Sequence, residues 1–231
     1  MVSVRVVSLV PSVTETLLAW GVVPVACTRF CEQPSILAVG GTKNPEIADI
    51  VALAPDLVVV NDEENRREDA EALVDAGLVV HACSPRSVDE VAPALTALAG
   101  AVGATVAVEP ADEALPPLDL AAFIPIWRRP WMTFAADTYG SSLLASIGVR
   151  NAFGDSADRY PTVELAEVVE RGADVVLAPT EPYAFQPFHL DAFRPVAPVV
   201  EVDGQDLFWW GVRTPDARRR LHTAITAALT P

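Results

Sequence analysis

The sequence predicts an α/β protein with two similar Rossmann-like lobes, each built on a parallel sheet, and a connecting helix between them. Two observations predict this fold. Apolar runs of strand length alternate with capped helical segments, which is typical of a parallel sheet covered on both faces. The stretch "DIVALAPDLVVVNDEE" at residues 49–64 also returns as "EVVERGADVVLAPTEP" at 167–182. A repeated α/β unit implies two lobes, although unrelated helix–strand units also share apolar runs.

The first lobe is predicted from alternating strand and helix signals. A Ser12-x-x-Glu15 capping box, Asn44 before a proline and an Asn65-x-x-Glu68 signal each mark a helix start. Gly21 and Gly77 mark two helix ends. The expected strands are residues 4–10, 22–27, 57–60 and 78–83, and the expected helices are 12–21, 44–53 and 65–77.

We expect an N-terminal lobe at residues 1–85, a connecting helix and linker at 86–123, and a C-terminal lobe at 124–231. The connecting helix should begin at Ser87, with apolar residues at helical spacing. Pro93 should kink or delay it. Residues 109–119, "EPADEALPPLD", are expected to form an irregular connection.

Composition narrows the function classes. The 231 residues are 51% hydrophobic and carry a net charge of −15. Nucleic-acid binding requires clustered Lys and Arg, so a chain this acidic is not expected to bind a polyanion. Three cysteines do not indicate a disulfide scaffold.

The beginning of the sequence is apolar but lacks an export signal's pattern. Arg5 is its one basic residue, and Pro11, Glu15 and Pro24 interrupt the apolar run. We therefore expect a cytoplasmic protein without a membrane span, and an extracytoplasmic one only if the true start lies upstream. A cytoplasmic protein would not deliver a ligand to an importer.

The candidate site lies where the parallel strands end. Ligands of open α/β sheets bind beyond the carboxyl ends of the strands, where residues 61–64 and 180–185 are expected. If the lobes face each other, these loops line one cleft. Glu63 and Glu181 should then face each other across it, accepting hydrogen bonds from a ligand or pairing with Arg66 or Arg128. The alternative is a solvated acid cluster at residues 62–64, favoured by the following helix N-terminus.

Aromatic residues gather in the second half. "IWRRPWM" contains Trp127 and Trp131, and "EPYAFQPF" contains Tyr183 and Phe185. The adjacent Trp209 and Trp210 cannot both enter one core from a strand, because strand side chains alternate. Such residues suit the apolar faces of a flat ligand.

Nothing in the sequence predicts an enzyme. It contains no nucleophile elbow, HExxH motif, phosphate loop or GxGxxG. Cys27, Cys31, His81 and Cys83 are the candidate metal ligands, but their spacing is not a zinc pattern. We interpret the cysteines as small buried hydrophobes and predict no metal site.

Several blocks resemble the helical-backbone metal-receptor family, the vitamin B12 and siderophore receptors of ABC importers. They are "RVVSLVPSVTETLLAWG", "TRFCEQP", "VGGTKNPEIADIVALAPDLVVVNDEENRREDAEAL", "IPIWRRPWMTFAADTY", "TVELAEVVERGADVVLAPTEPYAF" and "DLFWWGVRTP". The resemblance covers the chain except about residues 103–122. It implies two lobes joined by one rigid helix, with a corrin ring held in the cleft.

The resemblance also assigns residues. It implies an aromatic ligand contact at Phe30, Trp127, Tyr160 and one of the two adjacent tryptophans. Thr42 and Asn61 fall near positions that are aromatic in vitamin B12 receptors. Family members dock onto their transporter through one Glu on each lobe, and here the aligned positions hold alanine, with Asp49 and Glu167 one residue later.

We therefore expect a monomeric, non-enzymatic protein that needs no cofactor and binds a corrinoid or similar metal chelate between its lobes. Two alternatives are a cofactor-handling enzyme on the same fold and a degenerate receptor acting as an interaction module. The predicted ligand-binding residues are Phe30, Thr42, Asn61, Glu63, Glu64, Trp127, Arg128, Trp131, Tyr160, Glu181, Tyr183, Phe185, Trp209 and Trp210, and the predicted transporter-docking residues are Asp49 and Glu167.

Overall fold

The structure is a computed structural model that describes residues 4–229. The chain forms two compact units. The first contains the described residues up to Pro85 together with 89–110 and 210–212, and the second contains 86–88, 111–209 and the described residues from 213 on. The predicted fold class is confirmed, because both units are α/β with a parallel sheet. The predicted lobe boundaries stay a prediction.

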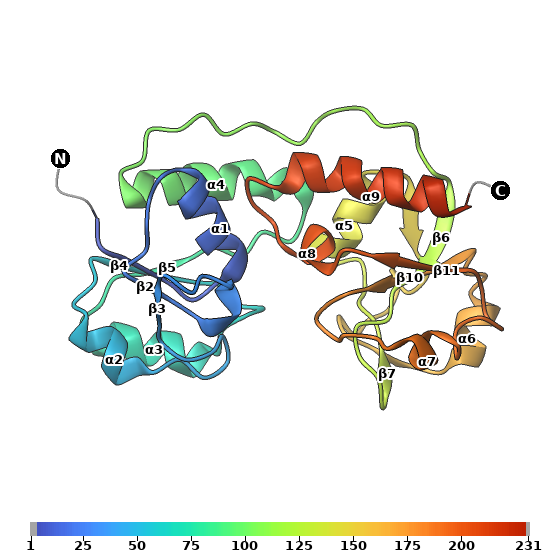
Figure 1. The fold of residues 1–231 in the computed structure, drawn as a ribbon, viewed down its shortest axis with the longest axis horizontal. Helices are drawn as coiled ribbons and strands as arrows, with labels where there is room; N and C mark the ends of the chain where they lie inside the picture. Colours follow the sequence, from blue (N-terminus) through green and yellow to red (C-terminus); the bar gives the residue numbers. More distant parts are fainter. Residues whose placement is uncertain (1–3, 230–231) are drawn as a thin grey trace. The chain divides into compact units, whose positions relative to one another are not determined.

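The first unit is built on a five-stranded parallel sheet in the order β3-β2-β1-β4-β5. Helices α2 and α3 cover one face of the sheet, and α1 and α4 cover the other (Figure 1). The elements are β1 (Val6–Ser8), α1 (Pro11–Ala19), β2 (Ala26–Cys27), the 3-10 helix η1 (Arg29–Cys31), β3 (Leu37–Ala38), α2 (Ile47–Ala52), β4 (Leu57–Val60), α3 (Arg67–Asp75), β5 (Val80–Ala82) and α4 (Val88–Val102).

The second unit has a four-stranded parallel sheet in the order β11-β10-β6-β8 and a small antiparallel pair, β7 with β9. Helices α6 and α7 lie on one side of the main sheet, with α5, α8 and α9 on the other (Figure 1). The elements are β6 (Leu120–Phe123), β7 (Trp131–Met132), α5 (Tyr139–Ala145), β8 (Val149–Asn151), β9 (Thr162–Val163), α6 (Leu165–Glu170), β10 (Val175–Pro179), α7 (Pro187–Leu190), β11 (Val199–Val202), α8 (Gly204–Phe208) and α9 (Thr214–Leu229).

The predicted repeat appears as matching strand order and matching contacts. The order β2-β1-β4-β5 in one unit corresponds to β8-β6-β10-β11 in the other. Before β4, Asp56 accepts a hydrogen bond from the Arg5 amide at 2.8 Å. Before β10, Asp174 accepts one from the Ala121 amide, also at 2.8 Å. Equivalent aspartates therefore fix equivalent strand pairs, β1 with β4 in the first unit and β6 with β10 in the second.

Helix α4 follows the predicted apolar pattern. Its inward residues are all buried, at Val88, Val91, Leu95, Leu98 and Val102. The helix begins at Val88, so Pro93 lies inside it and does not delay it, contrary to one of our two expectations. Pro93 is the sixth residue of α4 and lacks the amide that would donate to the Asp89 carbonyl, so the helix continues without one of its internal hydrogen bonds.

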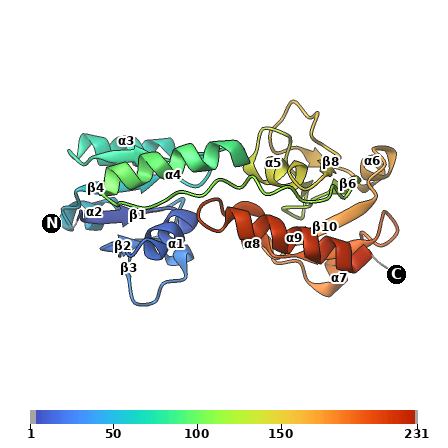
Figure 2. The ribbon, with the colours of Figure 1, turned by 90° about the horizontal axis from the view of Figure 1, so that it is seen from above.

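The irregular connection after α4 is held by side chains of α9. Figures 1 and 2 show the connection running alongside α9 in the second unit. Arg218 donates to the Ala111 carbonyl at 2.6 Å, and the His222 ring lies 2.8 Å from the Pro116 carbonyl. A segment without regular backbone pairing is thus ordered through its carbonyl groups.

Two predicted helix starts in the first unit are wrong. Helix α1 begins at Pro11 with no side-chain cap, so Ser12 lies inside it and the predicted capping box does not form. Helix α2 begins at Ile47, with Glu46 at the N-cap position, two residues after the predicted N-cap Asn44. Pro11 lacks an amide and so leaves one orphan donor fewer for a side chain to satisfy.

The third predicted cap, Asn65, has a different role. Helix α3 begins at Arg67 without a side-chain cap. The Asn65 side chain is buried and donates to the carbonyls of Leu9 at 3.2 Å and Thr42 at 2.9 Å. Its oxygen accepts from the Asn61 amide at 2.9 Å. One side chain therefore joins three loops at the carboxyl ends of β1, β3 and β4.

We predict that Asn65→Ala destabilises the protein by about 3 kcal/mol, because it leaves buried carbonyl and amide groups without partners. Asn44→Ala is the matched control. Asn44 is exposed and should change the free energy of unfolding by less than about 0.5 kcal/mol. Urea denaturation of both variants measures the difference, and equal stability would contradict the role assigned to Asn65.

Candidate functional site

The strand-end loops of the first unit hold five predicted site residues. Phe30 lies in η1 after β2, Thr42 lies in the loop after β3, and Asn61, Glu63 and Glu64 follow β4. All of these loops start at the carboxyl end of a parallel strand, where ligands of such sheets bind. The structure therefore brings these residues to one edge of the sheet.

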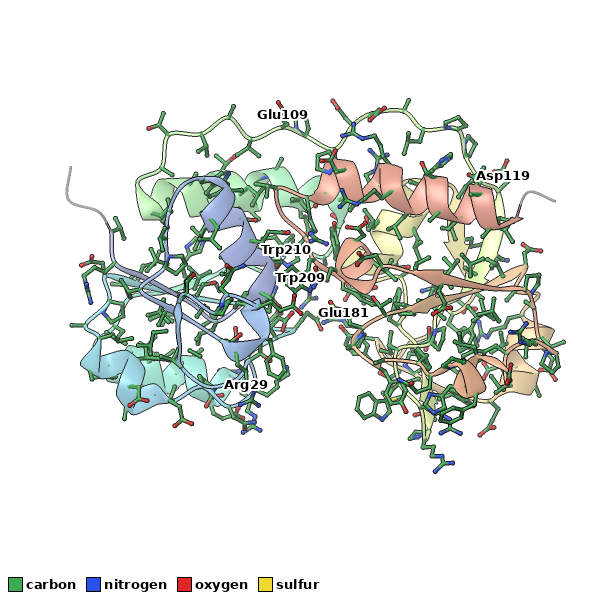
Figure 3. The ribbon with its side chains drawn as sticks, in the orientation of Figure 1. Arg29, Glu109, Asp119, Glu181, Trp209 and Trp210 are labelled. Carbon is green, nitrogen blue, oxygen red and sulfur yellow. The ribbon has the colours of Figure 1, made fainter. Side chains whose placement is uncertain are left out.

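Phe30 and Arg29 form an exposed wall at this edge, which we call the Phe30 wall. The Phe30 side chain is 50% exposed, and the Arg29 guanidinium lies 4.9 Å from its ring centroid. Figure 3 labels Arg29 at this edge of the unit. A Cβ added to Gly41 would lie 3.0 Å from the Phe30 ring and 3.2 Å from the guanidinium. Glycine at position 41 is what lets both side chains lie flat on the loop.

Asn61 supports the site from beneath. It is buried, and its amide group donates to the Cys83 carbonyl at 3.1 Å. Its oxygen accepts from the backbone amides of Glu63 at 2.7 Å and Glu64 at 3.3 Å. The predicted ligand contact at Asn61 stays a prediction, and the structure gives this residue a turn-forming role.

The acids after β4 differ in their surroundings. Asp62 is exposed, whereas Glu63 and Glu64 are half-buried. The Lys43 ammonium donates to the Glu63 carbonyl at 2.6 Å. Burial raises the pKa of Glu64, and Cys31 and Glu63 add to this effect while Lys43 opposes it. The strand thus ends in a turn wrapped around Asn61, and only part of the acid cluster is solvated.

The second unit gathers aromatic residues from two separate segments into what we call the aromatic cluster. Trp127 and Tyr183 meet edge to face at 5.2 Å, and Tyr183 lies 4.8 Å from Phe185. Phe185 stacks on Trp131 at 6.3 Å. The tryptophans belong to the hairpin that forms β7, and the other two follow β10. Trp127 is 47% exposed, so the cluster presents an aromatic surface.

The hairpin adds positive charge next to this surface. The Arg128 guanidinium lies 5.7 Å from the Trp131 ring centroid. Arg129 has a φ of 68°, a conformation that non-glycine residues adopt rarely and mainly at functional or tightly packed positions. In an acidic chain, two adjacent arginines at one aromatic surface favour a ligand with negative or polar edge groups.

His189 belongs to the same cluster, and the sequence analysis missed it. It is buried, and its Nδ1 accepts from the Gln186 amide at 3.0 Å. Its ring lies 5.7 Å from Tyr183. Burial lowers the pKa of His189, and Arg128 and Arg129 lower it further. His189 is therefore neutral at pH 7, and only the loop after β10 could have drawn attention to it.

The remaining predicted site residues lie elsewhere. Tyr160 is 37% exposed in the loop before β9. Glu181 follows β10, as Glu63 follows β4, and packs against Gly204, where a Cβ would lie 2.4 Å from the glutamate side chain. Trp209 is half-buried with the Arg213 guanidinium 5.2 Å from its ring, whereas Trp210 is buried and belongs to the first unit. Their predicted ligand contacts, and the predicted opposition of Glu63 and Glu181, stay predictions.

The two predicted docking acids occupy equivalent helices. Asp49 is exposed on α2, and Glu167 lies on α6. Glu167 accepts from Arg171 at 3.0 Å, and Arg171 also donates to Asp155. The pair is thus symmetric in position and differs in local charge.

Neither a metal-binding cluster nor a membrane-spanning helix is found among the residues that the structure describes. Among residues 4–229, no group of three or more His, Cys, Asp or Glu side chains is placed to hold a metal ion. Within the same residues, no helix combines the length and apolar character needed to cross a membrane.

Comparisons with known proteins agree with the predicted resemblance. No family model matches the sequence. A vitamin B12-binding protein of Salmonella choleraesuis is 26% identical over 192 residues, which cover 75% of this chain and 71% of the relative.

Solved structures share the fold over nearly the whole chain. The periplasmic vitamin B12 binding protein BtuF of Vibrio cholerae superposes with a TM-score of 0.79 at 21% identity and covers 99% of both chains. A periplasmic heme binding protein of Pseudomonas aeruginosa gives a TM-score of 0.77 at 17% identity and covers 100% of this chain and 95% of its own. The predicted resemblance to the metal-receptor family is confirmed.

The cytoplasmic prediction is wrong. The solved structures that share this fold include several periplasmic binding proteins, which points to a location outside the cytoplasm. The prediction depended on the charge and prolines of the first residues, and these do not decide where a protein of this fold is located. Without a cytoplasmic location, the expectation that the protein does not deliver a ligand to an importer has lost its main support.

We predict that Glu64→Gln changes the pH dependence of stability. Because burial raises the pKa of Glu64 in the folded protein, the folded state holds this proton more tightly than the unfolded state. Wild-type stability is therefore lost as the pH rises from the ordinary glutamate value of about 4.3 through the raised value. Glutamine avoids this loss, so the variant should gain stability relative to wild type across that window and keep the gain at higher pH. Denaturation curves at a series of pH values measure it, and a pH-independent difference would contradict the prediction.

Proposed function

We propose that this protein is a non-enzymatic receptor for a flat metal chelate of the corrinoid or haem type, acting outside the cytoplasm. The observation that carries the proposal is the aromatic cluster, which presents Trp127 next to the arginines of the β7 hairpin. The relatives and structural neighbours named for vitamin B12 or heme binding support it.

The physical basis is the match between surface and ligand. A corrin or porphyrin has two broad apolar faces and a polar edge, so it gains most from aromatic side chains on its face and charged groups at its rim. The aromatic cluster offers both kinds of contact, and the Phe30 wall offers a second aromatic side chain with its own arginine. The chelate would be cargo, and we propose that the protein needs no resident cofactor.

We predict that Trp127→Ala weakens binding of aquocobalamin or haemin by about tenfold, which corresponds to roughly 1.4 kcal/mol of lost stacking. Trp127→Phe should restore most of the affinity, because it keeps an aromatic face. Trp20→Phe, in the first unit after α1, is the control for the fluorescence signal. Titration followed by Trp quenching and chelate absorbance measures all three.

Lack of saturable binding of either chelate would refute the proposal. Recovery of a chemically altered chelate would instead favour the alternative of a cofactor-handling enzyme on the same fold. The relatives are binding proteins, which supports binding without chemistry. Mass spectrometry of the released chelate distinguishes the two.

We also propose that an ABC importer is the partner and that Asp49 and Glu167 contact it. The equivalent positions of these two acids, on α2 and α6 of the repeated units, support this proposal. We predict that reversing both charges, Asp49→Lys with Glu167→Lys, abolishes stimulation of the importer's ATP hydrolysis and leaves the affinity for the chelate unchanged. Undiminished stimulation would rule out these two residues as the docking acids.

A further inference from the structure

Two cysteines lie directly beneath the Phe30 wall. Cys27 ends β2 and Cys31 ends η1, and their exposed fractions are 1% and 2%. The Cys31 amide donates to the Thr28 carbonyl at 3.1 Å, which closes a turn and folds Cys31 back towards Cys27. The two side chains lie close enough for each to change the pKa of the other. Two buried cysteines at the ends of one short turn form a pair, unlike an isolated buried cysteine.

The surroundings shift the pKa values of the two thiols in opposite directions. The neighbouring Cys27 side chain lowers the pKa of Cys31 to about 6, against the effect of burial, and the hydroxyl groups of Thr14 and Thr28 help to lower it. These hydroxyl oxygens lie 3.2 Å and 3.3 Å from the Cys31 sulfur. The same proximity to Cys31, together with burial, raises the pKa of Cys27. One member of the pair is thus disposed to be a thiolate while the other keeps its proton.

Cys83 provides a contrast within the same unit. Its thiol donates weakly to the Ala94 carbonyl at 3.9 Å, and burial raises its pKa to about 12. A thiol in that state is a poor nucleophile, because thiolates carry out disulfide exchange.

We propose that Cys27 and Cys31 are an oxidisable pair that an external small-molecule disulfide converts into an intrachain disulfide beneath the Phe30 wall. The Cys31 thiolate attacks one sulfur of the external disulfide, whose S–S bond breaks and releases one thiolate. Cys27 then gives up its proton to solvent and attacks the Cys31 sulfur, which releases the second thiolate. The protein loses two electrons and, starting from the Cys31 thiolate, the one proton of Cys27, and the external disulfide becomes two thiolates that take up protons from solvent.

The position of the pair lets an oxidant reach it and lets a disulfide there affect the Phe30 wall. Arg29, Phe30 and Glu32 are exposed, so opening one turn of η1 uncovers Cys31. Compartments outside the cytoplasm are oxidising, and disulfides persist there. The location rests on the proposed function, whereas the pairing of the thiols rests on the fold alone. A bridge between residues 27 and 31 would fix the turn that carries Phe30.

Tryptic mapping tests the pairing directly. Cleavage after Arg29 separates the two cysteines, which then lie on the peptides 6–29 and 30–43, while Cys83 lies on 68–86. The reduced full chain is incubated with oxidised glutathione, unfolded, alkylated and digested. We expect peptides 6–29 and 30–43 to be joined, with Cys83 alkylated. Cys83→Ser should oxidise in the same way, and Cys27→Ser should stop at a glutathione adduct on Cys31.

Alkylation of all three cysteines after oxidation would overturn the proposal, as would a stable glutathione adduct on wild-type Cys31 or a bridge to Cys83. Hydrogen exchange tests the consequence. Amides of residues 28–32 should exchange at least about tenfold more slowly in the oxidised protein, and unchanged exchange would show that the bridge does not fix the turn. Aquocobalamin and haemin are titrated into both forms. If neither form binds while the bridge is found, the proposed function fails and the oxidisable pair stands.

Discussion

The first unit depends on the side-chain amide of Asn65. This one group bonds the carbonyls of Leu9 and Thr42 and the amide of Asn61, so it holds the ends of three strands at fixed positions. The Leu9 carbonyl and the Asn61 amide are bonded in buried positions and the Thr42 carbonyl in a partly buried one, so water does not readily replace a lost partner. Through Asn61 the same contact sets the turn that carries Glu63 and Glu64. The positions of these acids are thus a consequence of a buried hydrogen-bond network.

The second unit uses an asparagine in a comparable way. Asn151, at the end of β8, donates to the Phe134 carbonyl at 2.7 Å and accepts from the Phe153 amide at 2.9 Å. Both units also share the carboxylate that pairs the central strands, Asp56 in one and Asp174 in the other. The two units thus share a framework but present different surfaces at the ends of their strands. A single half-exposed ring lies at the strand ends of the first unit, and a group of packed rings lies at those of the second.

The charged side chains beside these aromatic rings are positive, whereas the chain as a whole is acidic. The protein carries a net charge of −15, but its exposed aromatic residues are accompanied by Arg29, Arg128 and Arg129. Long-range repulsion between an acidic protein and an anionic ligand is offset locally by such groups, because screening limits charge effects to about 8–10 Å at physiological salt. A neutral His189 beneath the cluster adds polarity without adding charge. The same Phe30 wall lies over a thiol pair whose oxidation state can change its rigidity.

The sequence by itself determined the α/β class, the repeat and the aromatic, strand-end character of the candidate site. Runs such as residues 57–60 are apolar on both faces, and only a covered parallel sheet buries both faces of a strand. The sequence could not determine which hydrogen-bond partners the buried polar side chains find. Asn65 has the pattern of a helix cap, but its partner Leu9 lies 56 residues away, and a local pattern cannot anticipate such a bond. The two-residue strand β3 and the meeting of Trp127 with Tyr183 were likewise decided by tertiary structure, because each depends on how separate segments pack.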